Sequence, residues 1–310
     1  MTAEHSAATP ASSERGFVIV AVLWILAALS ALAVIFSVYL SNSAQALAVN
    51  DTGLRVETLV SASLELAAYQ LLLAGDKARP SQGSFQFRLD NADVRVSFAS
   101  EAARIDLNFA PKEMLAGFFA GLGADQAAAR EYADRIAGWR TRPVPNAAND
   151  EAALYAAAGQ TYAPRQSLFT HVNELSLVLG LPPGLVDRAL PFVTVFNGSS
   201  GVDVLIAAPE VIAALPGMTP SSLRDFLNER AGLSKDGSAI AAALGPAKAN
   251  AEIPKSMSFR VLTAIRFNDG RRSSSEVVMT LGGKDDPYRV LSWQDDIGPG
   301  RGPGKRVVLR

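Results

Sequence analysis

The sequence predicts an α+β protein with a long N-terminal transmembrane helix packed on a small antiparallel sheet, and with a large all-helical insertion domain. Three observations support this fold class. A long apolar run lies near the start of the 310 residues. Two stretches far apart in the chain alternate apolar and polar residues, which is typical of strands. The chain between them is rich in alanine and is divided by proline and glycine, as expected for a series of short helices.

The long helix begins with a membrane-spanning half over residues 17–36. This run contains one polar residue, Ser30, and no charged residue. Twenty helical residues at about 1.5 Å each reach across a hydrocarbon core of about 30 Å. A plain single-span anchor and a cleaved secretory signal ending near Ala44–Gln45–Ala46 are the alternatives, although a signal usually has a shorter apolar region.

Residues 37–75 are predicted to continue this helix outside the membrane. Their apolar residues recur at steps of three and four, which places them on one helix face. We expect that face to pack on the sheet, through Val56, Val60, Leu64, Ala67 and Leu71. The helix should end at Gly75–Asp76, because glycine commonly follows a helix C-terminus.

The antiparallel sheet is predicted from two separate stretches, residues 84–108 and 255–294. The first reads as a hairpin that turns over Asp90–Asp93. The second contains Asn268–Asp269–Gly270 between two alternating runs, and Asp-Gly is a favoured hairpin turn. A further strand is expected over Tyr288–Trp293. The two stretches should pair in one sheet. The segment 295–310 is rich in glycine and proline and is predicted to be a flexible tail.

Residues 109–254 are predicted to form the helical insertion domain. Helices are expected over Pro111–Leu122, Ala124–Arg140, His171–Leu179, Gly184–Phe192, Pro209–Leu215 and Ser221–Glu229. Leu215–Met218 and Leu179–Pro182 resemble the hairpins of helix-hairpin-helix units, which can hold DNA through backbone N–H groups. Thr219 and Pro182 stand where a second glycine is expected, and proline has no N–H to donate. We therefore assign these units to helix packing, with nucleic-acid contact as the alternative.

The composition argues against several classes of function. The formal net charge is −1, so no overall basic charge attracts polyanions. No cysteine is present, which excludes disulfides and thiolate chemistry. The two histidines, His5 and His171, accompany no nucleophile motif such as G-x-S-x-G. We predict that the chain has no catalytic residue and is not an enzyme. A membrane-anchored hydrolase is disfavoured.

Four segments carry a resemblance to a known family. Glu14-Arg15-Gly16-Phe17 resembles the processing site of type IV pilin-like proteins, where a prepilin peptidase cuts after the glycine and methylates the new first residue. With the segments Ile105–Pro111, Val172–Leu175 and Tyr288–Trp293, the order of elements resembles general secretion pathway protein K, a minor pseudopilin of bacterial type II secretion systems. The resemblance implies that Gly16 and Phe17 flank the cut, and that residues 1–16 are a leader peptide.

The resemblance also implies the location and the partners of the chain. We expect a single-pass protein of the bacterial inner membrane whose bulk, including residues 37–75, lies in the periplasm. It would be a structural subunit at the tip of the secretion pseudopilus. Its partners would be other minor pseudopilins, the major pseudopilin, the prepilin peptidase and inner-membrane lipid, with no nucleic acid. A membrane-anchored DNA-uptake factor using the helix-hairpin-helix units is the alternative.

Two positions of the chain bear on the family's pattern. Pilin-like subunits generally carry a glutamate at the fifth mature residue, where this chain has Ala21, a departure that family K shares. That family is also associated with calcium bound after a tryptophan. Here Trp139 is followed by Arg140-Thr141-Arg142, and Asn149, Asp150 and Glu151 are the nearby oxygen ligands. Calcium takes six to eight oxygens, so we predict no metal site and no cofactor, with calcium as the open alternative.

Overall fold

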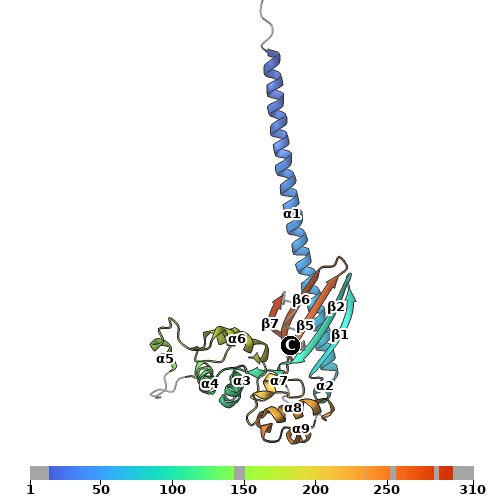
Figure 1. The fold of residues 1–310 in the computed structure, drawn as a ribbon. Coiled ribbons are helices and arrows are strands. Elements are labelled where there is room, and N and C mark those ends of the chain that lie inside the picture. The colour runs from blue at the N-terminus through green and yellow to red at the C-terminus, as the bar shows by residue number, and fades with distance from the viewer. Residues whose placement is uncertain (1–13, 143–150, 235, 252–255, 283–285, 296–310) are drawn as a thin grey trace, which may run out of the picture. The chain divides into compact units, whose positions relative to one another are not determined.

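The structure is a computed structural model (Figure 1). The chain forms two compact units, and the division between them, after Thr58, lies within one helix. The structure describes residues 14–142, 151–234, 236–251, 256–282 and 286–295. The predicted leader 1–16 and tail 295–310 therefore lie outside the described residues, except for 14–16 and Asp295.

The first unit contains the N-terminal part of helix α1 (Glu14–Leu73). Its apolar side chains are exposed from Val18 to Leu40, a stretch long and apolar enough to cross a membrane. This stretch continues four residues beyond the predicted end at Phe36, because Val38, Tyr39 and Leu40 extend the apolar run. Its length of 23 residues exceeds the roughly 20 that a bilayer requires.

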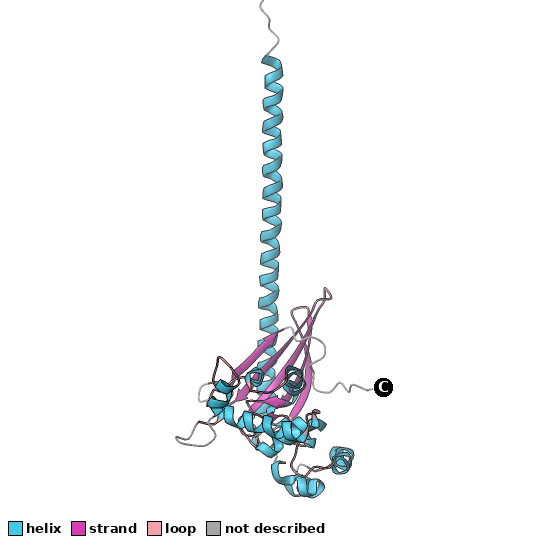
Figure 2. Ribbon diagram, turned by 60° about the vertical axis from the view of Figure 1, so that its left-hand side comes forward, coloured by secondary structure: helices cyan, strands magenta, loops and turns pink. Residues whose placement is uncertain are grey.

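The second unit begins with the last four turns of α1. The predicted apolar face is buried at Val60, Leu64, Ala67 and Leu71, whereas Val56 lies in the first unit and is half-buried. Figures 1 and 2 both show these turns lying against one face of the sheet. The helix ends at Leu73 and is followed by the short helix α2 (Gly75–Ala78).

Five antiparallel strands form the main sheet, in the order β1-β2-β5-β6-β7. Strands β1 (Gln82–Leu89) and β2 (Ala92–Ser100) come from the first stretch, and β5 (Ser258–Phe267), β6 (Arg272–Leu281) and β7 (Tyr288–Asp295) come from the second. β2 pairs with β5 over nine residues. The predicted pairing of the two distant stretches in one sheet is therefore confirmed for the first stretch up to Ser100. The prediction is wrong for residues 101–108, because β3 in that segment pairs with β4 in a separate ladder.

The first hairpin turn is shorter than predicted. Asp90 and Asn91 alone form it, with φ values of 47° and 60°. Two successive residues with positive φ give the tight turn that matches the twist of antiparallel strands, and Asn and Asp tolerate this backbone better than most residues. The predicted turn over Asp90–Asp93 is wrong, because Ala92 is already buried in β2 and pairs with Leu89.

The insertion consists of short helices and one small parallel ladder. The ladder joins β3 (Ile105–Asp106) to β4 (Val193–Thr194). The α-helices are α3 (Lys112–Gly121), α4 (Gln126–Arg140), α5 (Glu151–Ala157), α6 (Pro183–Ala189), α7 (Pro209–Ala213), α8 (Pro220–Glu229) and α9 (Gly237–Leu244). The 3-10 turns are η1 (Glu101–Ala103), η2 (Val172–Leu177), η3 (Leu190–Phe192), η4 (Arg230–Gly232) and η5 (Gly245–Asn250).

The predicted helices agree with α3, α4, α7 and α8, and two others need correction. His171–Leu179 was expected as an α-helix, but it forms only η2, because a cap at His171 and extended backbone at Val178 limit it to two turns. Gly184–Phe192 begins one residue earlier, at Pro183, and its α-helix ends at Ala189. Pro191 explains this end, since it cannot donate an N–H to continue the helix.

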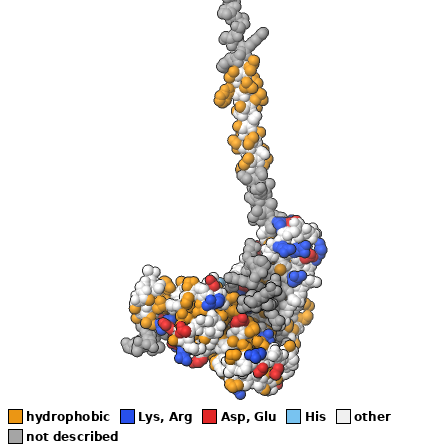
Figure 3. Space-filling view, viewed as in Figure 1, with side chains coloured by type: hydrophobic (Ala, Val, Ile, Leu, Met, Phe, Trp, Pro, Cys, Tyr) orange, Lys and Arg blue, Asp and Glu red, His pale blue; other side chains and the backbone are white. Residues whose placement is uncertain are grey.

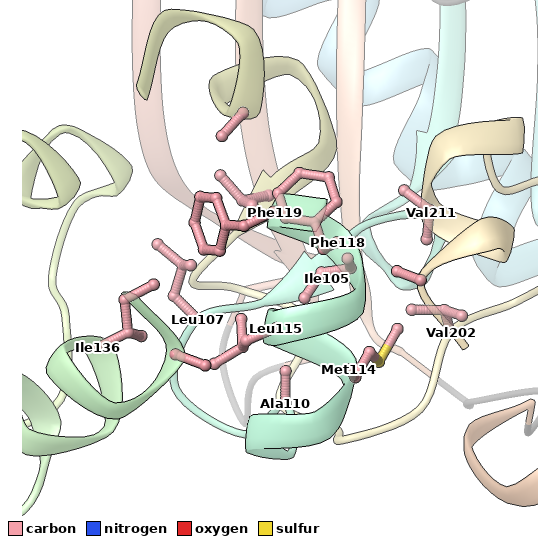
Figure 4. Close-up of a cluster of buried hydrophobic side chains, with 14 of the residues drawn as sticks. Ile105, Leu107, Ala110, Met114, Leu115, Phe118, Phe119, Ile136, Val202 and Val211 are labelled. Carbon is pink, nitrogen blue, oxygen red and sulfur yellow. The ribbon is translucent and has the colours of Figure 1, made fainter. Parts of the chain in front are cut away.

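Helix α3 lies at the centre of the core of the insertion (Figure 4). Its buried side chains are Met114, Leu115, Phe118 and Phe119. The same cluster contains Ile105 of the ladder, Leu107 directly after it, Ile136 of α4 and Val211 of α7. Apolar burial of this extent is the main stabilising contribution for helices too short to be stable alone.

Gly117 is predicted to be required where α3 meets α7. A Cβ at this position would lie 2.9 Å from the backbone oxygen of Ala214, which cannot rotate away. Gly117→Ala should therefore destabilise the fold by about 1–3 kcal/mol, although alanine normally favours a helix. Gly121→Ala, in the same helix with open space around its Cβ, is the matched control and should be neutral or stabilising. Thermal unfolding of both variants is the measurement, and equal midpoints would contradict the close contact.

Candidate functional site

A buried charge cluster joins the sheet to the insertion, and we call it the Glu101 cluster. Glu101 lies in η1, directly after β2, and its side chain is fully buried. Arg260 of β5 donates to both carboxylate oxygens, Nε to Oε1 at 2.8 Å and Nη2 to Oε2 at 3.1 Å. Arg104 adds a contact of 3.2 Å, and the hydroxyl of Thr194 in β4 donates to Oε2. Arg260 also pairs with Glu276 of β6.

Electrostatics keep the carboxylate of this cluster ionised. Burial alone would raise the pKa of Glu101, but the charges of Arg260 and Arg104 and the hydrogen bonds from Arg260 and Thr194 hold it below its usual value. Burial alone would lower the pKa of Arg260, but the carboxylates of Glu101 and Glu276 hold it above its usual value. A two-oxygen contact between arginine and carboxylate fixes orientation as well as distance. The cluster therefore fixes how strands β5 and β6 meet the insertion.

Hydrogen bonds join the segment Ile105–Pro111 to several other parts of the insertion, so we call it an anchoring segment. Asp106 accepts hydrogen bonds from the backbone N–H groups of Asn108 and Gly198, both at 2.8 Å. Burial raises the pKa of Asp106, and these hydrogen bonds partly offset that rise. Asn108 exchanges two hydrogen bonds with the backbone of Phe169. Arg140 of α4 donates to two backbone oxygens of the segment, those of Leu107 and Ala110.

The segment Val172–Leu175 organises the region around Trp139. Glu174 accepts hydrogen bonds from the indole Nε1 of Trp139 at 3.2 Å and from the backbone of Thr170 at 2.9 Å. Burial tends to raise the pKa of Glu174, but the hydrogen bonds from Thr170 and Trp139 and the charge of Arg165 lower it overall. His171 accepts the N–H of Asn173 through Nδ1, so the histidine caps a turn.

The third segment, Tyr288–Trp293, is most of strand β7 at the sheet edge. The hydroxyl of Tyr288 lies 3.1 Å from a carboxylate oxygen of Glu65 in α1. Trp293 donates its indole N–H to Asp295 at 2.8 Å, and Ser275 of β6 donates to the same oxygen. This segment therefore ties the sheet edge to α1 and to its neighbouring strand.

The loop that follows Trp139, which is the alternative calcium site, is only partly described. Asn149 and Asp150 lie outside the described residues, and Arg142 is exposed. Glu151 pairs with Arg135 at 3.2 Å, so this ligand candidate already has a cationic partner. Within the described ranges, no group of three or more His, Asp or Glu residues could hold a metal ion. The absence of a metal site therefore stays a prediction.

We predict that chelation leaves the stability unchanged. Calcium bound only by the folded state would raise the unfolding midpoint as its concentration rises. With Glu151 paired to Arg135, titration of calcium into the EDTA-treated protein should shift the midpoint by less than 1 °C, on the order of the error of such a measurement. A saturable rise of several degrees, absent with magnesium, would refute this prediction.

The two helix-hairpin-helix-like units form turns between helical segments, with Gly217 and Gly180 at positive φ. Thr219 caps α8 by accepting the N–H of Ser222, and Pro182 precedes α6. Arg230 donates to the backbone oxygen of Ala207 and is therefore committed to packing. These contacts agree with a packing role for both units.

Gly16 and Phe17 lie in the first turn of α1, and the structure describes their backbone but not their side chains. Sequence reasoning found the anchoring segments but missed the Glu101 cluster. No local pattern marks Glu101 or Arg260, which are 159 residues apart in the chain. Asp106 and Asn108 lay within a segment already singled out, although their roles required the structure.

Comparison with known proteins relates part of this chain to one family. Residues 97–198 match the family model of type II secretion system protein K. This region contains β3, the anchoring segments and most of the Glu101 cluster. Among curated proteins, none matches. A chain in the crystal structure of the GspK-GspI-GspJ complex from the type 2 secretion system of enterotoxigenic Escherichia coli has the same fold, with a TM-score of 0.58. The identity is 15%, over 80% of this chain and 99% of that one. Both comparisons thus relate this chain to protein K of type II secretion systems, the family model through residues 97–198 and the solved structure through the fold.

Proposed function

We propose that this chain is a minor pseudopilin at the tip of the type II secretion pseudopilus, where it acts as a structural subunit in protein export. The match of residues 97–198 to protein K carries the proposal. The apolar stretch Val18–Leu40 provides the anchor, for which we propose the inner membrane, with the second unit in the periplasm. The buried polar side chains of Glu101 and Asp106 accept hydrogen bonds from within the chain, which is consistent with a structural role for them.

The tip position is supported by two features. Ala21 offers no carboxylate to pair with the terminal amine of a subunit above it, and an isolated charge within lipid is costly. Within the second unit, the insertion lies at the end of the sheet opposite the two hairpin turns, beside the C-terminal end of α1 (Figures 1 and 2). An insertion at that end would obstruct the stacking of another subunit.

Partners follow from the same comparison. The solved complex contains GspK, GspI and GspJ. We infer that this chain assembles with the corresponding minor pseudopilins, then with the major pseudopilin, after a prepilin peptidase cuts between Gly16 and Phe17. The DNA-uptake alternative gains no support from these comparisons.

The test is complementation in a type II-secreting host whose own gene for this chain is deleted. Expression of the full chain should restore secretion. Crosslinks from an exposed insertion residue such as Arg130 should reach other minor pseudopilins. Crosslinks repeated along the major pseudopilin would refute the tip position, and failure to restore secretion would refute the function.

A further inference from the structure

Four arginines gather on the face of the sheet that points away from α1. The strand register places Arg88, Asp93, Arg266 and Arg272 side by side across four strands. Arg95 lies in the next row on the same face, opposite Ala264. The opposite side chains of β2 and β5, such as Val94 and Ile265, are buried toward α1. We call this surface, near the two hairpin turns, the arginine face.

Three of these arginines form no ion pair, although Asp93 lies in the same row. Arg88 pairs with Asp93 at 3.5 Å. Among the residues that the structure describes, the side chains of Arg95, Arg266 and Arg272 make no hydrogen bond or ion pair, and all three residues are exposed. Arg266 and Arg272 are directly opposite each other, an arrangement of like charges that destabilises a sheet. The arrangement thus has a cost within the isolated chain, which a partner of opposite charge would offset.

The charge of this surface is local. Figure 3 shows Lys and Arg side chains gathered over this end of the sheet. The adjacent turn contains Asp269, but Arg271 already pairs with it at 2.7 Å. The turn residue Asp90 and the row residue Asp93 are the other acids there. The whole chain has a net charge of −1, so the arginine face stands out from an otherwise balanced molecule.

We propose that the arginine face binds a carboxylate-rich protein surface of another component of the secretion apparatus, an inference that rests on the proposed function. Arginine is enriched in protein interfaces and pairs with carboxylates through two parallel hydrogen bonds. Arg266 and Arg272 lie on neighbouring strands about 4.8 Å apart, so each can pair with a separate carboxylate of the partner. The small neighbours Ala264 and Ser274 leave room for close approach, and Asp93 within the row favours a patterned protein surface over a uniform polyanion.

The direct test replaces each unpaired arginine by lysine, in the full chain expressed in the deletion strain. A lysine amine reacts with a partner carboxylate under a carbodiimide, whereas arginine does not. Arg266→Lys, Arg272→Lys and Arg95→Lys should each give the same crosslinked partner, identified by mass spectrometry at defined Asp or Glu residues. Arg224→Lys, on the exposed surface of α8, is the control and should not give this product. Absence of any product beyond the control would overturn the proposal.

Charge reversal separates this inference from the proposed function. If the wild-type chain restores secretion, Arg266→Glu with Arg272→Glu should lower it several-fold at unchanged membrane levels, while Arg224→Glu should not. Full secretion by the double variant would overturn the arginine face alone, whereas failure of the wild-type chain would overturn the function. A photo-reactive residue at position 266 that crosslinks to phospholipid rather than to protein would also refute the proposal.

Discussion

Replacing Glu101 by alanine is expected to lower the free energy of unfolding by about 3–5 kcal/mol, since removal of one partner leaves buried charge uncompensated. Arg260 would retain Glu276, but Arg104 and the hydroxyl of Thr194 would each lose a buried partner. Denaturant unfolding of the detergent-solubilised chain is the measurement. The control is Asp134→Asn, which breaks the exposed ion pair with Lys112 and should cost less than about 1 kcal/mol. Equal effects of the two substitutions would contradict the role assigned to the cluster.

The same residue gives a pH prediction with a definite sign. The pKa of Glu101 is lower in the folded chain than its ordinary value of 4.5. Its contribution to stability is therefore complete above about pH 4.5 and is lost as the pH falls toward the folded value. Glu101→Gln cannot titrate, so the variant should be less stable at neutral pH and should lose less stability on acidification. An acid dependence identical to that of the wild-type chain would contradict this reasoning.

Replacing Gly16 by valine is expected to abolish maturation and, with it, secretion. The proposed cut follows this glycine, and an extended residue without a Cβ enters a narrow active site most easily. Mass spectrometry should find a wild-type chain that begins at Phe17 with an added methyl group, and a variant that retains residues 1–16. Ser12→Ala, also within the proposed leader 1–16, should mature normally. A wild-type start near Leu47 would instead indicate an ordinary secretory signal.

Local sequence patterns predicted the elements whose determinants are close together in the chain. Alternation and the Asp-Gly turn were sufficient for β5 and β6. Steps of three and four residues identified the buried face of α1, because those residues share one side of a helix. The anchoring segments Ile105–Pro111 and Val172–Leu175 were recognisable by resemblance, although not by their hydrogen bonds.

Features that depend on distant partners could not be read in the same way. The ladder of β3 and β4 has two residues in each strand, too few for any period to be visible. The sequence analysis did not predict helix α9, because Ala241–Ala243 are compatible with many structures. Only the burial of Ile240 and Leu244 in the folded chain identifies the packed face of this helix. The Glu101 cluster and the arginine face arise only when β2 pairs with β5, and the identity of Arg260 or Arg266 does not reveal that register.

The pairing of β2 with β5 also sets an order of events during synthesis. The hairpin of β1 and β2 is complete by Ser100, but its partner strand begins only at Ser258. At the usual 5–20 residues per second, roughly 10–30 s pass before that partner has been made. Until then the edge of β2 lacks its partner strand, a situation prone to mispairing, and the apolar side of Val94 and Val96 needs another cover. The anchored α1, whose buried face is made first, can cover that apolar side while the insertion folds, so the nascent chain need not wait unprotected for its own C-terminal strands.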